Sequence, residues 1–250
     1  MIKFFRNIRS NLLAEGKSSR YLKYAIGEII LVVFGILIAL SINNWNEKRK
    51  DLIKEKATLY KFLQDLESDA SYFEDNLKEV LSIDALHKEL FLTGFKGKKT
   101  INHNNPNHIR RSLVYNPIAK ENDPNITNKI DDDKIREEIQ IYFRSMSEVF
   151  ESKTEHENIV LEIREYLRKN KIHNVENWFE SEMLTPGTNE ISFDIIDITS
   201  LIELSQNKDF QQLVLESSIK VNETKSALIK LIEDNTRLIS QIKQYIKNND

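Results

Sequence analysis

The feature that most constrains this chain is one long apolar run near its N-terminus. Residues 24–42 read YAIGEIILVVFGILIALSI, and Glu28 is the only charged side chain among them. A helix of this length extends for about 28 Å, close to the roughly 30 Å of a bilayer's hydrocarbon core. Tyr24 and Trp45 lie near the two ends, where aromatic side chains are typical of membrane interfaces. We therefore predict a transmembrane helix over residues 24–42, with Tyr24, Glu28 and Trp45 among its anchor residues.

Two other interpretations of this run stay open. The first is a buried helix of a soluble protein, but the chain as a whole is 30% charged and has no second segment apolar enough to surround such a helix. The second is a cleaved signal peptide, because Ala39-Leu40-Ser41 offers the small residues of a cleavage site. The run is longer than an ordinary signal-peptide core and begins only after residue 23, so an uncleaved anchor is the better prediction.

The orientation of the anchor follows from the charges that flank it. Residues 1–23 carry cations at six positions and a single acidic residue, Glu15, while residues 48–61 on the other side are also rich in Lys and Arg. Short tails weigh more than long domains in setting topology. We expect a single-pass protein of the inner (cytoplasmic) membrane, with residues 1–23 as a cytoplasmic tail and residues 43–250 in the periplasm.

The tail has a pattern of its own. Phe4, Phe5, Ile8, Leu12 and Leu13 recur at helical spacing between the cations. This pattern is typical of an amphipathic helix that lies in the interface of an anionic leaflet. A disordered basic tail is the alternative.

Three stretches of the first fifty residues carry a resemblance to a known family. They read KFFRNIRSNLLAEGK, YAIGEIILVVFGILIAL and INNWNEKRK. The segment resembles the N-terminus of a family of Bacteroidota single-pass membrane proteins that contain a domain of unknown function. The resemblance is close over about the first 55 residues and looser at residues 128–130, 136–143 and 207–213. It implies a bacterial membrane protein and no particular activity.

The remainder of the chain has few residues that interrupt helices. It holds only 6 Gly and 4 Pro in 250 residues, which favours long helices over a sandwich or barrel. Apolar residues recur with spacings of three and four, as in a coiled coil, over residues 59–80, 135–167 and 221–245. We predict an all-α fold, in which residues 43–250 form an up-and-down bundle of long amphipathic helices.

Two segments should interrupt this bundle. Residues 93–133 are polar and rich in Asn and Pro, which predicts an irregular loop, and Asp131–Asp133 at its end offer N-caps for the next helix. Residues 171–188 should form a short helix and a turn. Residues 191–198 partly alternate between polar and apolar side chains, which predicts at most a minor strand.

The span itself carries a candidate association face. Glu28, Gly35 and Ala39 fall within about 40° of one another on a helix. Gly35 and Ala39 form a small-xxx-small pair, which allows two backbones to approach closely. We expect two copies to associate through this face. No Gly or Pro separates the span from residue 94, so we also expect the helix to continue past Trp45, with Asn43 and Asn44 as its only weak joint.

The residues offer little that indicates catalysis. With no Cys, there are no thiolate metal sites and no cysteine nucleophile, and no phosphate-binding glycine loop occurs. His103 and His108 share the loop HNNPNH and could reach one metal ion, but without a carboxylate close in sequence a solvated loop is the better interpretation. His156 falls in the core register, which indicates a buried polar layer. Asp131–Asp133 lack the spacing of a calcium loop. We expect no enzyme, no cofactor and no metal.

Three functions remain after these exclusions. The net charge of −3 and the lack of interleaved aromatics around residues 96–111 argue against nucleic acid as a partner. The preferred function is an interaction or assembly module of the cell envelope, whose partners are the lipid bilayer and either a second copy or another envelope protein. A ligand-sensing bundle that signals through a partner is the alternative. An envelope hydrolase with dispersed acid–base residues is the third.

Overall fold

The computed structural model describes residues 18–103, 105–184 and 195–249, and for residues 18–21, 24 and 181–184 it describes the backbone alone. The chain divides into two units, residues 1–57 and 58–250. The interfacial helix expected in the tail falls mostly on residues 1–17, which lie outside the described residues. Residues 191–194, half of the segment expected to form a minor strand, also lie outside them.

The described residues are helical, and the all-α prediction is confirmed. The only β pairing among them is an isolated bridge between His173 and Ile196. The helical elements in chain order are α2 (Ser18–Lys96), η1 (Pro106–Arg110), α3 (Ala119–Asn122), η2 (Ile126–Lys129), α4 (Asp133–Lys169), α5 (Val175–Leu184), α6 (Ile198–Leu204) and α7 (Lys208–Asn248).

In the first unit, α2 carries the apolar run found in the sequence. This run is long enough and apolar enough to cross a membrane, and none of it is buried. A Cβ added at Gly35 would meet no atom within 4 Å. The helix has no break at residues 43–45, in agreement with the continuity expected from the sequence. The Asn43 amide donates to Glu47 Oε1 at 3.1 Å, a bond between helix neighbours that does not compete with the backbone.

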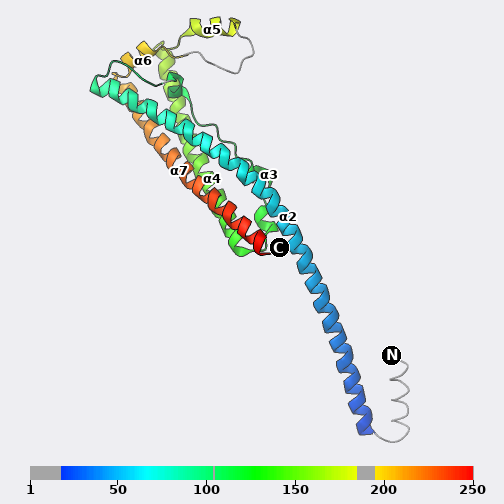
Figure 1. Ribbon diagram of the computed structural model, residues 1–250. Helices are drawn as coiled ribbons and strands as arrows, with labels where there is room; N and C mark the ends of the chain where they lie inside the picture. Colours follow the sequence, from blue (N-terminus) through cyan, green and yellow to red (C-terminus); the bar gives the residue numbers. More distant parts are fainter. Residues whose placement is uncertain (1–17, 104, 185–194, 250) are drawn as a thin grey trace. The chain divides into compact units, whose positions relative to one another are not determined.

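The second unit is a bundle of three long helices. The part of α2 that follows residue 57 packs with α4 and α7 (Figure 1). Their buried side chains recur at the spacing that the sequence predicted. The fully buried large side chains include Leu59, Phe62, Leu66, Phe73, Ile83, Leu86, Ile139, Tyr142 and Phe210.

The directions of the helices differ from a simple up-and-down bundle. One core cluster joins Leu59 and Ile139 to Ile242, and the other joins Leu90 to Phe210 and the C-terminal part of α4. Residue numbers therefore rise together along α2 and α4 and fall along α7. The up-and-down prediction is wrong for the first pair, because α2 and α4 run parallel and only α7 is antiparallel (Figure 1).

The segment between α2 and α4 makes this arrangement possible, because it returns the chain along the bundle. It was expected as an irregular loop at residues 93–133. Its turns η1, α3 and η2 and the residues beside them carry apolar side chains that join the core, so it packs as part of the bundle. The buried ones are Ile109, Leu113, Tyr115, Ala119, Ile126 and Ile130.

One buried carboxylate holds this return segment against α2. Asp69 accepts hydrogen bonds from the backbone N–H of Ile118 at 2.8 Å and of Ala119 at 3.0 Å, and from the Tyr142 hydroxyl at 3.0 Å. Burial raises the pKa of Asp69, against the lowering effect of these three donors. Asp69 thus connects α2, the return segment and α4 in one polar contact.

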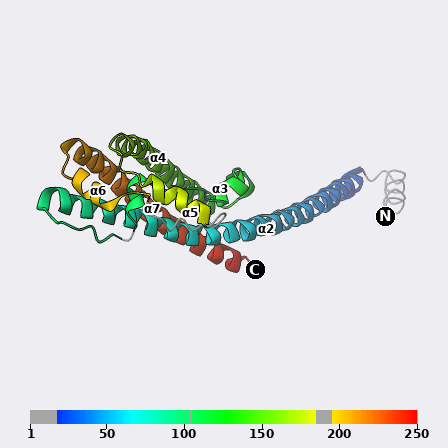
Figure 2. The same cartoon turned by 90° about the horizontal axis from the view of Figure 1, so that it is seen from above.

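The helix starts follow the expected chemistry. Asp132 caps α4 and accepts a hydrogen bond from the Ile135 N–H at 2.9 Å, so one of the three predicted aspartates does the capping. Asn207 caps α7 in the same way. The short helix predicted within residues 171–188 is α5, which ends at Leu184. The bundle is viewed from above in Figure 2, where α4 and α7 again lie beside the second half of α2.

Candidate binding cavity

A polar layer crosses the core of the bundle and uses one residue from each long helix. His87 of α2 and His156 of α4 both bond the hydroxyl of Ser217 of α7, with Nε2···Oγ distances of 3.2 and 3.1 Å. A serine hydroxyl has one proton, so it donates to one imidazole and accepts from the other. The prediction that His156 belongs to a buried polar layer is confirmed.

Both imidazoles of this layer are held neutral. Burial, with a smaller effect of the neighbouring His156, lowers the pKa of His87 to about 3. Burial likewise lowers the pKa of His156 to about 4. His87 is 3% exposed, and its Nδ1 has no hydrogen-bond partner in the part of the chain that the structure describes.

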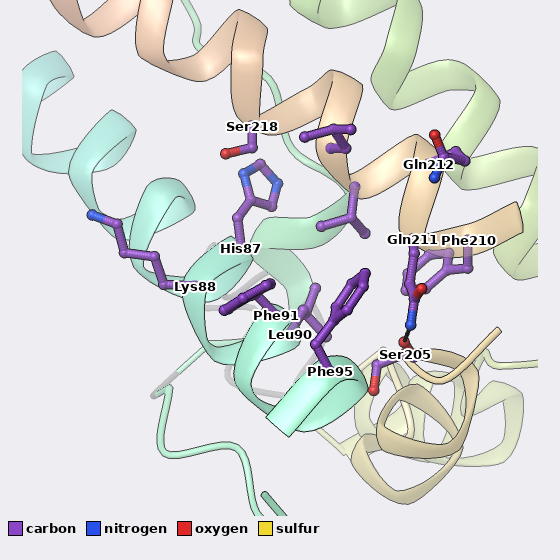
Figure 3. A pocket seen from close by; sticks show the side chains of 12 residues that line it. His87, Lys88, Leu90, Phe91, Phe95, Ser205, Phe210, Gln211, Gln212 and Ser218 are labelled. Carbon is purple, nitrogen blue, oxygen red and sulfur yellow. Dashed lines mark hydrogen bonds between the residues drawn. The ribbon is translucent and has the colours of Figure 1, made fainter. Parts of the chain in front are cut away.

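His87 also lines a cavity of about 320 Å³. The cavity lies where the C-terminal end of α2 meets the turn after α6 and the first half of α7. Figure 3 shows the side chains around it. Most of its wall is apolar, from Leu90, Phe91, Phe95, Phe210, Val214 and Leu215.

Two phenylalanines form the outer side of this wall. Phe91 and Phe95 lie one helical turn apart on α2, and their rings stack with centroids 5.2 Å apart and planes at 28°. They are 48% and 59% exposed. Phe210 and Val214 on α7 are buried behind them. The cavity therefore has a buried back and an open aromatic front.

The charged group of the wall and one of its two amides are already engaged. Lys88 Nζ pairs with Asp84 Oδ2 at 2.9 Å, and Lys225 Nζ pairs with the same oxygen at 3.2 Å. Burial raises the pKa of Asp84, but the hydrogen bonds from the two lysines outweigh burial and leave it lowered. The Gln211 amide donates to the Ser205 carbonyl at 3.0 Å.

Gly94 closes one end of this region by a close backbone approach. A Cβ at residue 94 would lie 2.2 Å from the carbonyl oxygen of Ser205 and 3.1 Å from Gln211 Nε2. Only glycine permits this distance between α2 and the turn before α7.

The two loop histidines named in the sequence do come together. His103 and His108 both lie within hydrogen-bond distance of Ser82 Oγ, at 3.2 and 2.9 Å. His103 Nε2 also donates to the Ser82 carbonyl at 2.8 Å, and its Nδ1 accepts from the Asn105 N–H at 3.0 Å. Their nitrogens therefore fasten the return segment to α2. The described residues contain no group of three or more potential metal ligands.

The residues proposed for the span belong to the first unit, whereas the cavity is formed by residues of the second. Gly35, Ala39 and Trp45 are exposed, and Glu28 is partly exposed. Arg49 lies over the Trp45 ring at 6.0 Å from its centroid. The side chain of Tyr24 lies outside the described residues. The association face of Glu28, Gly35 and Ala39 stays a prediction.

The cavity was not predicted from the sequence. Its signal was weak: Phe91 and Phe95 are spaced as helix neighbours, while Leu86 and Leu90 beside them take the core positions. Two apolar residues beside the core positions of a helix indicate an additional apolar surface. They do not show that a gap lies between this helix and its neighbour. Only the packing of α2 against α7 creates that gap.

One family model matches the chain. Residues 28–101 match a family of unknown function, DUF6090. The match covers most of the apolar run and most of α2, together with the first residues after this helix. It supports the domain of unknown function implied by the resemblance. No curated protein and no solved structure matches.

Proposed function

We propose that the chain is a single-pass, membrane-anchored helical module of the bacterial cell envelope that acts by binding another protein. It has no catalytic chemistry of its own in this proposal. The apolar, exposed run in α2 supplies the anchor. The second unit supplies the binding surface. The partner is a second copy of the chain or another envelope protein.

The observation that carries this proposal is the exposure of aromatic side chains on a bundle that already has a buried apolar core. Phe95 on α2 is 59% exposed, and Phe150 on α4 is 55% exposed. Full burial of such a side chain is worth about 1.5–3 kcal/mol. Phe95 also stacks on the exposed Phe91, and exposed aromatic side chains grouped in this way are typical of protein–protein interfaces.

Site-specific photocrosslinking in living cells tests the interaction. A benzophenone amino acid is placed at Phe95 or Phe150 of the full chain, with Ser226, an exposed position on α7, as the matched control. We expect a discrete crosslinked protein adduct from at least one phenylalanine position and none from Ser226. Equal adducts from all three positions, or none from either phenylalanine, would contradict the proposal.

We propose that the chain is anchored in the inner membrane, with the second unit outside the cytoplasm and residues 1–23 in the cytoplasm. The excess of cations over acidic residues in the short tail supports this orientation. Lipid is then the first partner of the chain, through residues 24–42.

A second candidate function is a ligand-sensing bundle that signals through a partner protein. The cavity favours it, because its volume lies at the lower end of the range for small-molecule sites and its wall is largely apolar. A sensing protein should change its crosslinking at Phe150 when the ligand is added, whereas a constitutive assembly module should not.

A further inference from the structure

The volume of the cavity sets the size of what it can hold. An engineered apolar cavity of about 150 Å³ holds a benzene molecule. The cavity beside His87 has a volume of about 320 Å³, roughly twice as large. A molecule with an apolar body of about twelve carbon atoms matches this space.

The charged groups around the cavity indicate whether its ligand is charged or neutral. The one charged side chain in the wall is Lys88, and its ammonium group is paired with Asp84. Asp84 is in turn shared with Lys225. No carboxylate lines the wall to bind a cation, the ammonium group of Lys88 is already engaged by Asp84, and any ionic ligand would have to leave water for a largely apolar surface. An uncharged molecule avoids this desolvation penalty.

One polar group at the inner end of the wall still has hydrogen-bonding capacity. The hydroxyl of Ser218 has no hydrogen-bond partner among the described residues and comes from α7, next to the Ser217 of the polar layer. His87 of α2 lies beside it in the wall, with its unpaired Nδ1 buried. Figure 3 shows both side chains in the part of the cavity away from Phe95. The wall thus has one polar region and one aromatic region, which is the pattern of an amphiphile site.

We propose that this cavity binds an uncharged, medium-chain amphiphile. Its apolar chain lies against Phe91, Phe95 and Leu215, and its single hydroxyl or amide group lies at the Ser218 hydroxyl. This inference rests on the second candidate function, to which it gives a ligand class. The bound chain covers only the inner faces of the two stacked phenylalanines, so their outer faces stay available to a protein partner.

Photolabelling with decanol that carries a diazirine tests this proposal on the full chain in lipid nanodiscs. We expect saturable labelling of residues 87–95 or 210–218, mapped by mass spectrometry, and competition by unlabelled decanol. Decanoate, which has the same chain but a charge, should compete at least about tenfold more weakly.

Two tryptophan variants separate the cavity from non-specific labelling through the bilayer. Ser218→Trp fills the cavity and should lower the saturable labelling at least about tenfold. Leu161→Trp, on the exposed surface of α4, adds the same side chain elsewhere and should leave it unchanged. Thermal unfolding of both variants, followed by circular dichroism, shows whether each is folded, and Leu215→Trp at the rim replaces Ser218→Trp if the latter is not.

The contact of the ligand with Ser218 has its own test. Ser218→Ala removes one hydrogen-bonding group and should weaken decanol competition about 3- to 10-fold, as expected for one net hydrogen bond. Equal labelling of the Ser218→Trp and Leu161→Trp variants, or stronger competition by decanoate than by decanol, would overturn the proposal. Either result leaves the crosslinking at Phe150, which is not part of the cavity wall, unaffected, so the protein-binding function stands or falls separately.

Discussion

Gly94 has only a hydrogen atom in place of a side chain, and this allows α2 to approach the turn before α7 closely at the end of the bundle. In Gly94→Ala, the new methyl group would lie 2.2 Å from the Ser205 carbonyl oxygen. Because backbone atoms must move to relieve this contact, we expect a loss of about 1–3 kcal/mol in the free energy of unfolding. Thermal and urea unfolding of the full chain in detergent measures it. Gly27→Ala, at a residue outside the proposed association face with no atom within 4 Å of the added Cβ, is the control and should lose nothing.

The buried histidines make stability depend on pH. The pKa values of His87 and His156 in the folded chain, about 3 and about 4, lie below the ordinary 6.5. The unfolded chain therefore takes up protons below pH 6.5 that the folded chain does not. Stability is complete above that pH and is lost as the pH falls toward 4, by up to about 1.4 kcal/mol per pH unit for each histidine.

Urea unfolding at pH 7.5, 6.0 and 5.0 checks this pH dependence. His87→Leu removes one of the two histidines with a lowered pKa. The free energy of unfolding of this variant should therefore depend less steeply on pH, by about one proton taken up on unfolding. Ser226→Ala, at a position of α7 away from the polar layer, should leave the pH dependence of the unfolding free energy as it is in the unmodified chain. An unchanged slope in His87→Leu would mean that other groups cause the effect.

At the scale of helices, local sequence patterns were a good guide to where elements lie. The heptad spacings predicted the three long helices, and the aspartates at residues 131–133 predicted the start of α4. These features depend on neighbours within a few residues of each other. The parallel direction of α2 and α4 was missed, because it depends on contacts between residues far apart in the chain. Asp69 and the return segment are an example, since they bond across about fifty residues.

The span offers a prediction at the same scale. Gly35→Ile places a branched side chain on the proposed association face and should weaken dimers of the span, because the backbones can no longer approach closely. A membrane two-hybrid assay of residues 1–56 measures the association. Val33→Ile, on another face, is the control. If both variants give the signal of the unmodified segment, the span does not associate through Glu28, Gly35 and Ala39.

For the molecule as a whole, topology is the first thing to test. A reporter that is active only outside the cytoplasm, fused after Asp250, should be active, because the cation-rich tail of residues 1–23 favours retention inside. The matched fusion carries a reporter that is active only in the cytoplasm and should be silent. The reverse result would place the bundle inside. Release of a soluble protein that lacks residues 1–41 would identify the apolar run as a cleaved signal.

The sequence by itself determined the helical class, the apolar run and the residues that face the core. Each of these depends on composition or on the period of a helix, which are local properties of the chain. The tertiary structure alone decided the direction of α4, the meeting of His87, Ser217 and His156, and the cavity beside them. These arise where three helices from distant parts of the chain pack together. The gap that such packing leaves depends on the shapes of facing side chains, for which no local pattern in the sequence carries a signal.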